Sequence, residues 1–274
     1  MGFCNFIPSL GKTCYFICMQ NISYQKSAID APACISNGWN LVKPNYWMYF
    51  GIGLLALLMV ACVPCVNILI MGPTTAGVYY VLLRAMRSEP VDFGMMFKGF
   101  EKFVPTMVVG VIQSIPGMIM QGVQFTGDLG RIVSQITRSR GSSGNFFQAS
   151  DETSIAIAGG LMFLYLVLVF FFMLFSIAWA ITFAFALPLI IEHDLGPIDA
   201  IKLSARAGWS NPFGLVFLGF LIFLIAMIGV MAFCIGVFFV TPIIYAAYAF
   251  AYRQVFPLGG QAFAQGGGSY GQAV

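Results

Sequence analysis

Charge is the scarcest property of this sequence. Only 8% of its 274 residues are charged, whereas 59% are hydrophobic, and there is a single histidine. A soluble protein of this length has about a quarter of its residues charged, so most of the surface is expected to face lipid. The net charge of +3 is small and no basic run occurs. These features argue against nucleic acid as a partner.

The scarcity of histidine also limits the chemistry. His193 lies in Glu192-His193-Asp194, and consecutive residues point in different directions around a helix. A metalloenzyme would need a further set of strong ligands. We interpret these residues as a polar helix end. No catalytic residue, metal site or cofactor is predicted, and an enzyme is not expected.

The cysteines do not form a recognisable framework. Their odd number and irregular spacing do not fit paired disulfides, and the four N-terminal ones match no common zinc pattern. Cys62 and Cys65 form a CxxC sequence and are a candidate redox pair. No charge lies near them in the sequence, so an ordinary tight turn is the preferred alternative. The seven are Cys4, Cys14, Cys18, Cys34, Cys62, Cys65 and Cys234.

Long uncharged runs occur instead, and two of them resemble each other. Residues 44–83 and 211–252 carry no charge. Each run has a cysteine eight residues before a proline and a tyrosine six residues after it, and an arginine follows the run directly, eleven residues after the proline. Each is also preceded by Ile-Asp-Ala and Gly-Trp. The corresponding positions are Cys65 and Cys234, Pro73 and Pro242, Tyr79 and Tyr248, and Arg84 and Arg253. An internal duplication of such runs predicts a polytopic membrane protein.

The lengths of the runs predict the number of spans. Forty residues make about 60 Å of helix, twice the thickness of a hydrocarbon core of about 30 Å. Each run is therefore expected to be a hairpin of two helices. The sequence predicts an all-α, six-span bundle of three hairpins, at residues 46–86, 104–191 and 213–252.

The middle hairpin is the least regular. Residues 104–125 form one expected span, and residues 154–191 are interpreted as one long, tilted or protruding helix. Between them, Leu129, Ile132, Val133 and Ile136 have helical spacing. They predict a short helix on the outer leaflet.

Each hairpin is expected to follow an amphipathic helix at the cytoplasmic interface. In the segment 197–207, Ile198, Ile201, Ala205 and the following Gly208 fall on one side. Aromatic rings favour the interface, so the expected anchors are Trp39, Phe100 and Trp209.

Positive charge predicts the orientation. With six spans and a cytoplasmic N-terminus, ten Lys and Arg residues lie inside and only Arg131, Arg138 and Arg140 lie outside, as the positive-inside rule requires. Both termini are therefore expected in the cytoplasm. The predicted parts are an N-terminal segment (1–27), a membrane domain (28–256) and a Gly-rich tail (257–274). No signal peptide is predicted, and Met19 is a candidate start of translation.

Two surfaces are candidates for binding. Basic residues near the inner face are candidate contacts for anionic lipid headgroups: Arg84, Arg87, Lys98, Lys102 and Arg206. Tyrosines and small residues on the last span are either packed within the bundle or form a face for a partner helix: Tyr245, Ala247, Tyr248, Ala251 and Tyr252.

The sequence resembles a family of uncharacterised bacterial membrane proteins, some of which carry the name of a glycerophosphodiester phosphodiesterase membrane domain. The resemblance covers about residues 28–256. It lies in Gly72-Pro73, in Glu89-Pro90-Val91, in Phe97 to Phe100, in Pro188-Leu189 and in Pro242 to Arg253. The family name implies an attached phosphodiesterase domain in some members. In this sequence the one grouping of acids with histidine is Glu192-His193-Asp194, which is interpreted as a polar helix end, so that activity is not expected.

The expected role is a non-catalytic accessory or scaffold subunit of a bacterial inner membrane, packed against lipid and other integral membrane subunits. The alternative is a transporter or lipid-handling protein for a neutral or amphipathic solute. It would need a polar path reaching Asn67 or Gln113.

Overall fold

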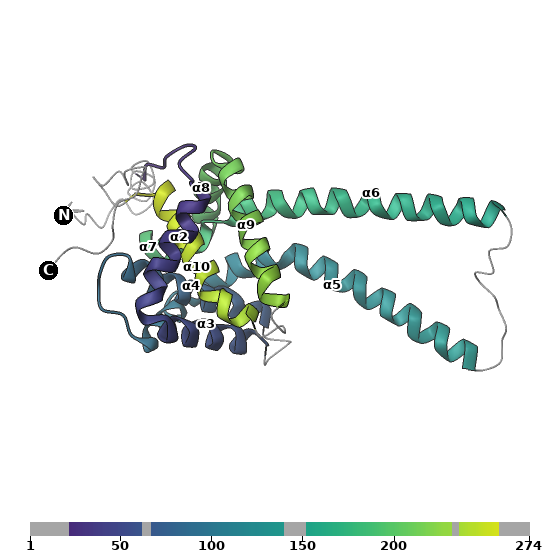
Figure 1. Ribbon diagram of the computed structural model, residues 1–274, viewed down its shortest axis with the longest axis horizontal. Helices are drawn as coiled ribbons and strands as arrows, with labels where there is room; N and C mark the ends of the chain where they lie inside the picture. The colour runs from purple at the N-terminus through teal and green to yellow at the C-terminus, as the bar shows by residue number, and fades with distance from the viewer. Residues whose placement is uncertain (1–21, 62–66, 140–151, 232–235, 258–274) are drawn as a thin grey trace, which may run out of the picture. The chain divides into compact units, whose positions relative to one another are not determined.

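The computed structural model describes residues 22–61, 67–139, 152–231 and 236–257, and every regular element in these ranges is a helix (Figure 1). The predicted all-α class is confirmed. The elements are α2 (Ala31–Val42), η1 (Lys43–Asn45), α3 (Tyr46–Ala61), α4 (Asn67–Ala85), η2 (Phe93–Phe100), α5 (Phe103–Ser139), α6 (Glu152–Phe183), α7 (Ala186–His193), α8 (Pro197–Trp209), α9 (Pro212–Met231) and α10 (Gly236–Val255).

Within the described ranges, five helical segments are long and apolar enough to cross a membrane. They are α4, the Phe103–Phe125 part of α5, the Phe163–His193 segment, α9 and α10. The chain is therefore a multi-pass membrane protein. The predicted first span, α3, has 16 residues and is shorter than these five. The predicted number of six spans stays a prediction.

The described residues form two compact units. Unit 1 comprises 22–54, 81–93, 206–231 and 236–257, and unit 2 comprises 55–61, 67–80, 94–139 and 152–205.

In unit 1, α2 runs antiparallel beside α10. The Asp30 N–H donates to Gln254 Oε1 (2.9 Å) near the C-terminal end of α10, and the Tyr46 hydroxyl donates to the Phe239 carbonyl (2.8 Å) near its N-terminal end. Between these two contacts Gly38 faces α10, where an added Cβ would lie 3.1 Å from the Ala247 nitrogen. The apolar side of α2 is thus buried against a long helix of the same chain.

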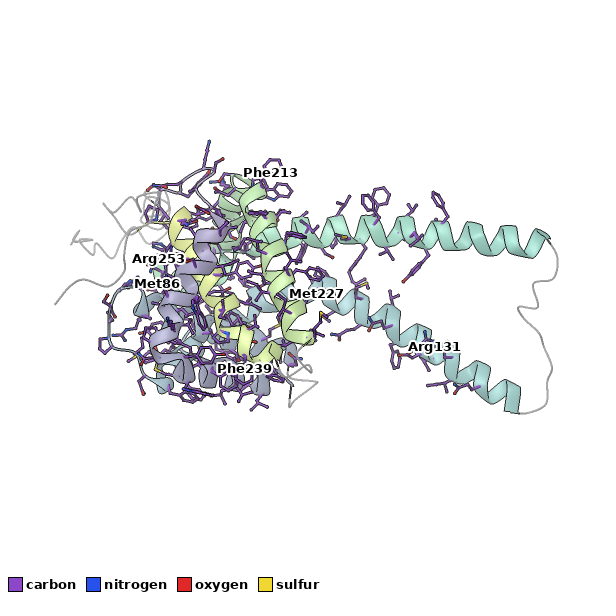
Figure 2. All side chains as sticks on the ribbon, viewed as in Figure 1. Met86, Arg131, Phe213, Met227, Phe239 and Arg253 are labelled. Atoms are coloured by element: carbon purple, nitrogen blue, oxygen red, sulfur yellow. The ribbon has the colours of Figure 1, made fainter. Side chains whose placement is uncertain are left out.

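Helix α9 adds a third element to unit 1 and leaves most of its surface exposed. One stripe is buried, consisting of Leu215, Leu218, Ile222 and Gly229. Large apolar side chains stand on the other sides, among them Phe213 (88% exposed) and Met227 (Figure 2). In lipid this exposed surface is solvated, because acyl chains are as apolar as the side chains.

In unit 2, small residues bring helices together. An added Cβ on Gly110 of α5 would lie 2.6 Å from the Gly72 Cα of α4. An added Cβ on Gly77 of α4 would collide with the Met96 carbonyl of η2, and one on Gly99 would collide with Gly77. These backbones can approach only because the side chains are absent.

The contacts of the short helices follow one pattern. Gly38 of α2 meets Ala246 of α10, four residues after Pro242, and Gly99 of η2 meets Gly77 of α4, four residues after Pro73. In α8, Ser204 bonds to the chain at the end of α6. Gly38 and Gly99 thus make matching contacts, each with a long helix four residues after a proline.

The middle hairpin differs from the expectation in two ways. The long helix α6 ends at Phe183, and α7 begins at Ala186, so 154–191 is not one helix. Pro188 explains the break, because its ring excludes the carbonyl four residues earlier. The segment around Leu129 and Ile132 is helical, but it continues α5 without interruption. The prediction of a separate helix on the outer leaflet is therefore wrong.

The predicted apolar face of α8 is largely not the side that packs within the chain, and its contact with the membrane interface stays a prediction. Ile198 is 65% exposed, whereas Ala200, Leu203, Ser204 and Ala207 are buried. The buried side of α8 consists mainly of small residues that fit against neighbouring helices. Ile198, a bulky apolar residue, lies on the exposed side.

Candidate functional site

The best-defined polar site in unit 2 lies at the break between α6 and α7. Ser204 is fully buried, and its hydroxyl donates to the Thr182 carbonyl (2.8 Å) and accepts from the Phe185 N–H (3.1 Å). One hydroxyl therefore satisfies two backbone groups at the helix break. An unpaired buried peptide group would otherwise cost about 1–3 kcal/mol.

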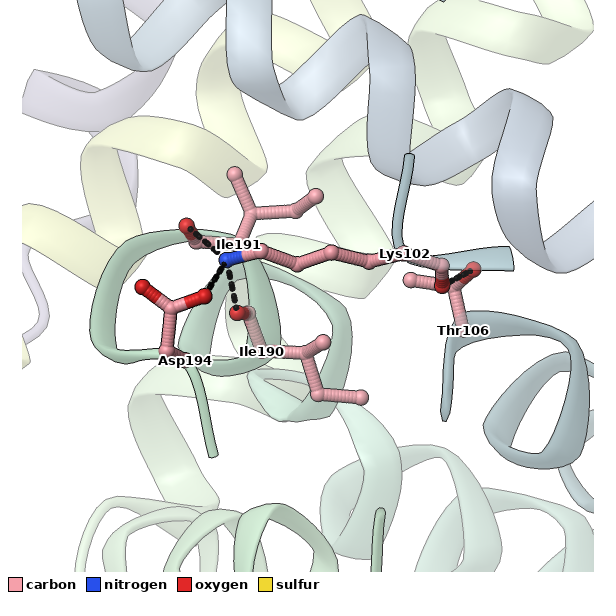
Figure 3. A network of polar contacts seen from close by, with 5 residues as sticks. All are labelled: Lys102, Thr106, Ile190, Ile191 and Asp194. Carbon is pink, nitrogen blue, oxygen red and sulfur yellow. Dashed lines mark hydrogen bonds and ion pairs between the residues drawn. The ribbon is translucent and has the colours of Figure 1, made fainter. Parts of the chain in front are cut away.

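Lys102 holds the other end of α7 (Figure 3). Its Nζ donates to the carbonyls of Ile190 and Ile191, both at 3.1 Å, and forms an ion pair with Asp194. Asp194 ends the helix in the left-handed conformation, with φ of 53°. A cation at a helix C-terminus is stabilising because the terminal carbonyls have no partner within the helix.

Lys102 has its donors occupied within the chain. An ammonium group has three donors, and all three have partners here: two carbonyls and one carboxylate. Lys102 therefore caps α7, and its predicted contact with a lipid headgroup stays a prediction. Ser204 and Lys102 together fix both ends of α7.

A second polar group lies at the start of α2 in unit 1. Gln254 Oε1 accepts from the Asp30 N–H and from the Cys34 thiol (3.2 Å), while Asp30 Oδ1 accepts from the Ala33 N–H (3.3 Å) as the cap of α2. Burial raises the pKa of the Cys34 thiol to about 12, and the adjacent Asp30 carboxylate adds to the shift. The thiol is therefore a weak donor rather than a nucleophile.

Asn211 anchors the chain that precedes α2. Its Oδ1 accepts from the Ala28 N–H (2.8 Å), and its Nδ2 donates to the carbonyls of Gln25 (3.0 Å) and Ala207 (2.9 Å). Sequence reasoning missed Asn211, Ser204 and Gln254. For Asn211 a local signal exists, since Asn followed by proline is typical of a helix start. Ser204 and Gln254 depend on distant carbonyl and N–H groups that no local pattern reveals.

The other predicted headgroup contacts are Arg84, Arg87, Lys98 and Arg206. Arg84 Nε donates to Glu89 at 2.7 Å. Lys98 is exposed and lies 5.9 Å from the centre of the Tyr80 ring. Arg87 and Arg206 are exposed. Lipid binding by these four residues stays a prediction.

The predicted partner face on α10 is largely occupied within the chain. Ala247, Ala251 and Tyr252 are fully buried, and Ala247 meets Gly38 of α2. For these three residues a contact face is wrong, and packing within the bundle is the arrangement observed. Tyr245 and Tyr248 are half-buried, and their role as a contact face stays a prediction.

The predicted aromatic anchors lie at or near the surface. Trp39 is 42% exposed and Trp209 is 55% exposed, while Phe100 is half-buried and stacks on Phe103 with ring centroids 6.3 Å apart. That these three rings lie at the membrane–water interface stays a prediction. Trp39 also lies edge-on to Tyr46, 6.1 Å between centroids, at the N-terminal end of α3.

The candidate redox pair, Cys62 and Cys65, lies outside the described residues. Among the residues that are described, no three His, Cys, Asp or Glu side chains group together as metal ligands would.

Comparison with known proteins does not supply a family or a function: no family model, no curated protein and no solved structure matches this chain. The function has to be argued from the geometry. The polar groups described above end helices, bridge a helix break or join segments, and these are structural tasks.

Proposed function

We propose that this chain is a non-catalytic scaffold or accessory subunit of a bacterial inner membrane, packed against lipid and other integral membrane subunits. The observation that carries the proposal is the surface of α6. In the Phe163–His193 segment, which comprises the C-terminal part of α6 together with α7, only 6% of the strongest apolar window is buried. Phe163, Phe170 and Phe171 are 70%, 57% and 63% exposed.

Such a surface is stable only in an apolar solvent. Burying apolar area contributes about 25 cal/mol per Å², so these rings in water would favour aggregation. Lipid solvates them, and another membrane helix can replace that lipid at small cost. A large apolar surface beside internally satisfied polar groups supports a packing role rather than a reaction.

The finer architecture is part of the proposal. We take α3 as the sixth span, because its 16 residues carry no charge and make about 24 Å of helix. The recurring order of one short and two long helices, with Gly38 and Gly99 in matching contacts, supports three related hairpins. We keep both termini in the cytoplasm, because ten of the thirteen basic residues then lie inside.

The relation to the membrane domain of the glycerophosphodiester phosphodiesterase family belongs to the same proposal. It rests on the motifs around Gly72-Pro73 and Pro242. Gly72 admits the α5 backbone, and Gly77 admits η2. Because these motifs serve helix packing, they support a membrane scaffold shared with that family. They do not imply its phosphodiesterase activity.

The test is a genetic and biochemical one. The chain is tagged in its native membrane and isolated in mild detergent, and the copurifying subunits are counted by native mass spectrometry. We expect a fixed stoichiometry, and we expect deletion of the chain to lower the amount of those subunits in the membrane. Normal amounts of every membrane complex in the deletion strain would contradict the proposal. A tagged, unrelated six-span protein is the control.

The alternative function is transport or handling of a neutral or amphipathic solute. One observation favours it: Gln113 is half-buried in α5, and its side-chain amide makes no hydrogen bond within the described part of the chain. Purified protein in liposomes would then speed the passage of such a solute, and Gln113→Leu would abolish the effect. A scaffold changes no permeability.

A further inference from the structure

Helix α5 carries a narrow strip of polar and small residues along its length. Because the helix is continuous from Phe103 to Ser139, residues three or four apart share a face. Within the apolar part, the strip consists of Thr106, Gly110, Gln113, Gly117, Gln121 and Gln124. The one other hydrogen-bonding side chain in this part, Ser114, donates to the Val111 carbonyl of its own helix (2.8 Å).

The first part of the strip is already a helix interface. Thr106 is fully buried, and an added Cβ on Gly72 of α4 would collide with the Thr106 carbonyl. Gly110 meets the Gly72 backbone one turn further along. Here α5 uses the strip for close packing against another helix.

The second part of the strip has a similar composition but no close neighbour among the residues that the structure describes. Nothing lies within 4 Å of an added Cβ on Gly117. Gln121 and Gln124 are exposed, and neither forms a hydrogen bond with any described residue. Both lie in the segment that is apolar enough to span a membrane. An amide in hydrocarbon without a partner is costly, so these groups require one.

The long helix of the same hairpin is a poor partner for these amides. Between Phe163 and Phe175, Tyr165 is the one residue of α6 whose side chain can form a hydrogen bond. A second copy of α5 is a good partner. A glutamine amide both donates and accepts, so Gln121 and Gln124 can pair with the same residues across a two-fold axis.

Charge supports the same partner. The strip continues beyond the apolar part with Asp128 and Arg131, one turn apart and both exposed, with Arg131 Nη1 3.5 Å from Asp128 Oδ1. Figure 2 labels Arg131 on α5. Copies inserted with one topology place their α5 helices in parallel. Asp128 of one copy can then approach Arg131 of the second copy, and the reverse contact forms by symmetry.

We propose that the chain forms a homodimer through the open part of this strip, with Gly117 permitting close approach and Gln121 and Gln124 bonding between the two α5 helices. This rests on the proposed membrane insertion of α5. It goes beyond the scaffold role by naming the first partner, a second copy of this chain.

The experiment measures the dimer fraction of full-length protein in lipid nanodiscs or vesicles by single-molecule photobleaching, over a range of protein-to-lipid ratios. We expect a dimer for the natural sequence. Gly117→Leu combined with Gln121→Leu should raise the dissociation constant at least tenfold. Gly122→Leu is the matched control: Gly122 is equally open but lies on the far side of α5, so its substitution should leave the dimer fraction unchanged.

Cysteine cross-linking adds an independent readout. A disulfide between copies is expected for Gln121→Cys and not for Val123→Cys. A natural protein that stays monomeric at all ratios would overturn the proposal, as would equal dimer fractions for the Gly117/Gln121 variant and the Gly122 control. If the protein is a monomer but still copurifies at fixed stoichiometry with other subunits, the dimer proposal is wrong and the proposed scaffold role is retained.

Discussion

Helices α10 and α6 are both long and apolar enough to span a membrane, yet their surroundings are opposite. The spanning window of α6 has a mean hydropathy of 2.6 and is 6% buried, whereas that of α10 has a mean hydropathy of 1.2 and is 44% buried. The more apolar helix is the less buried one. This is the reverse of a water-soluble core, where the largest apolar side chains lie inside.

The difference between α6 and α10 shows which residues indicate the interior of a protein that is surrounded by lipid. Phe and Leu on α6 gain little from leaving lipid for protein, because both surroundings are apolar. Ala246 and Ala247 on α10 are buried because small side chains allow α2 to approach. Small residues and satisfied polar groups therefore mark the protein contacts, and bulky apolar residues mark the lipid.

The largest expected effect on stability comes from comparing a buried phenylalanine with a lipid-facing one. Phe185, at the α6–α7 break, is fully buried, while Phe170 on α6 is 57% exposed. Phe185→Ala should lower the free energy of unfolding by about 3–5 kcal/mol, since it leaves a cavity. Phe170→Ala should change it by about 0.5 kcal/mol or less. Unfolding by SDS titration in detergent micelles measures both, and equal losses would break the comparison.

A somewhat smaller effect is expected from adding a side chain. A Cβ at Gly77 would collide with the Met96 carbonyl, while Gly219 on α9 has nothing within 4 Å. Gly77→Ala should cost about 3 kcal/mol through overpacking, whereas Gly219→Ala should be neutral or slightly stabilising. The thermal unfolding midpoint, followed by circular dichroism, distinguishes them. A tolerated Gly77→Ala would show that η2 does not pack closely on α4.

The bridge at the helix break is expected to contribute less. Ser204→Ala removes a hydroxyl that satisfies the Thr182 carbonyl and the Phe185 N–H, so unfolding should become easier by about 1–3 kcal/mol. Ser114→Ala is the control, because the Ser114 hydroxyl bonds only within its own helix. If both variants unfold at the same SDS fraction, the bridge is not a stabilising contact.

The smallest effect concerns pH and the buried thiol. The raised pKa of Cys34, about 12 against 9.0 for an ordinary thiol, favours the protonated form in the folded state. Its contribution to stability is full below pH 9 and is lost between pH 9 and about 12. From pH 9 to 10 we expect a loss of about 1 kcal/mol relative to Cys34→Ser, which does not titrate there. Parallel SDS titrations at the two pH values provide the measurement.

Much of the secondary structure was predictable from the sequence. The helix pairs expected at 46–86 and 213–252 correspond to α3 with α4 and to α9 with α10 within a few residues. Uncharged runs of this length can satisfy their backbone groups in a membrane only as helices. The break before Pro188 was missed, because proline is tolerated within many membrane helices and only the neighbours decide whether it ends one.

The polar sites were less predictable. Lys102 looks in the sequence like any basic residue near the inner face. It caps α7 because α5 begins beside residues 190–194. For Ala247 and Tyr252 the sequence left packing within the bundle and a partner face as alternatives, and their burial, with α2 beside α10, favours packing. Helical periodicity shows which residues share a face but not what that face meets.

The sequence by itself determined that lipid surrounds much of this protein and that the chain forms several membrane helices. Scarce charge and long apolar runs favour that arrangement over a water-soluble fold. Only the tertiary structure decided which faces are interior. In lipid the hydrophobic effect does not sort inside from outside, and that choice passes to close contacts between small residues and to individual hydrogen bonds. These depend on segments far apart in the chain, such as Gly38 with Ala246 and Ser204 with Thr182.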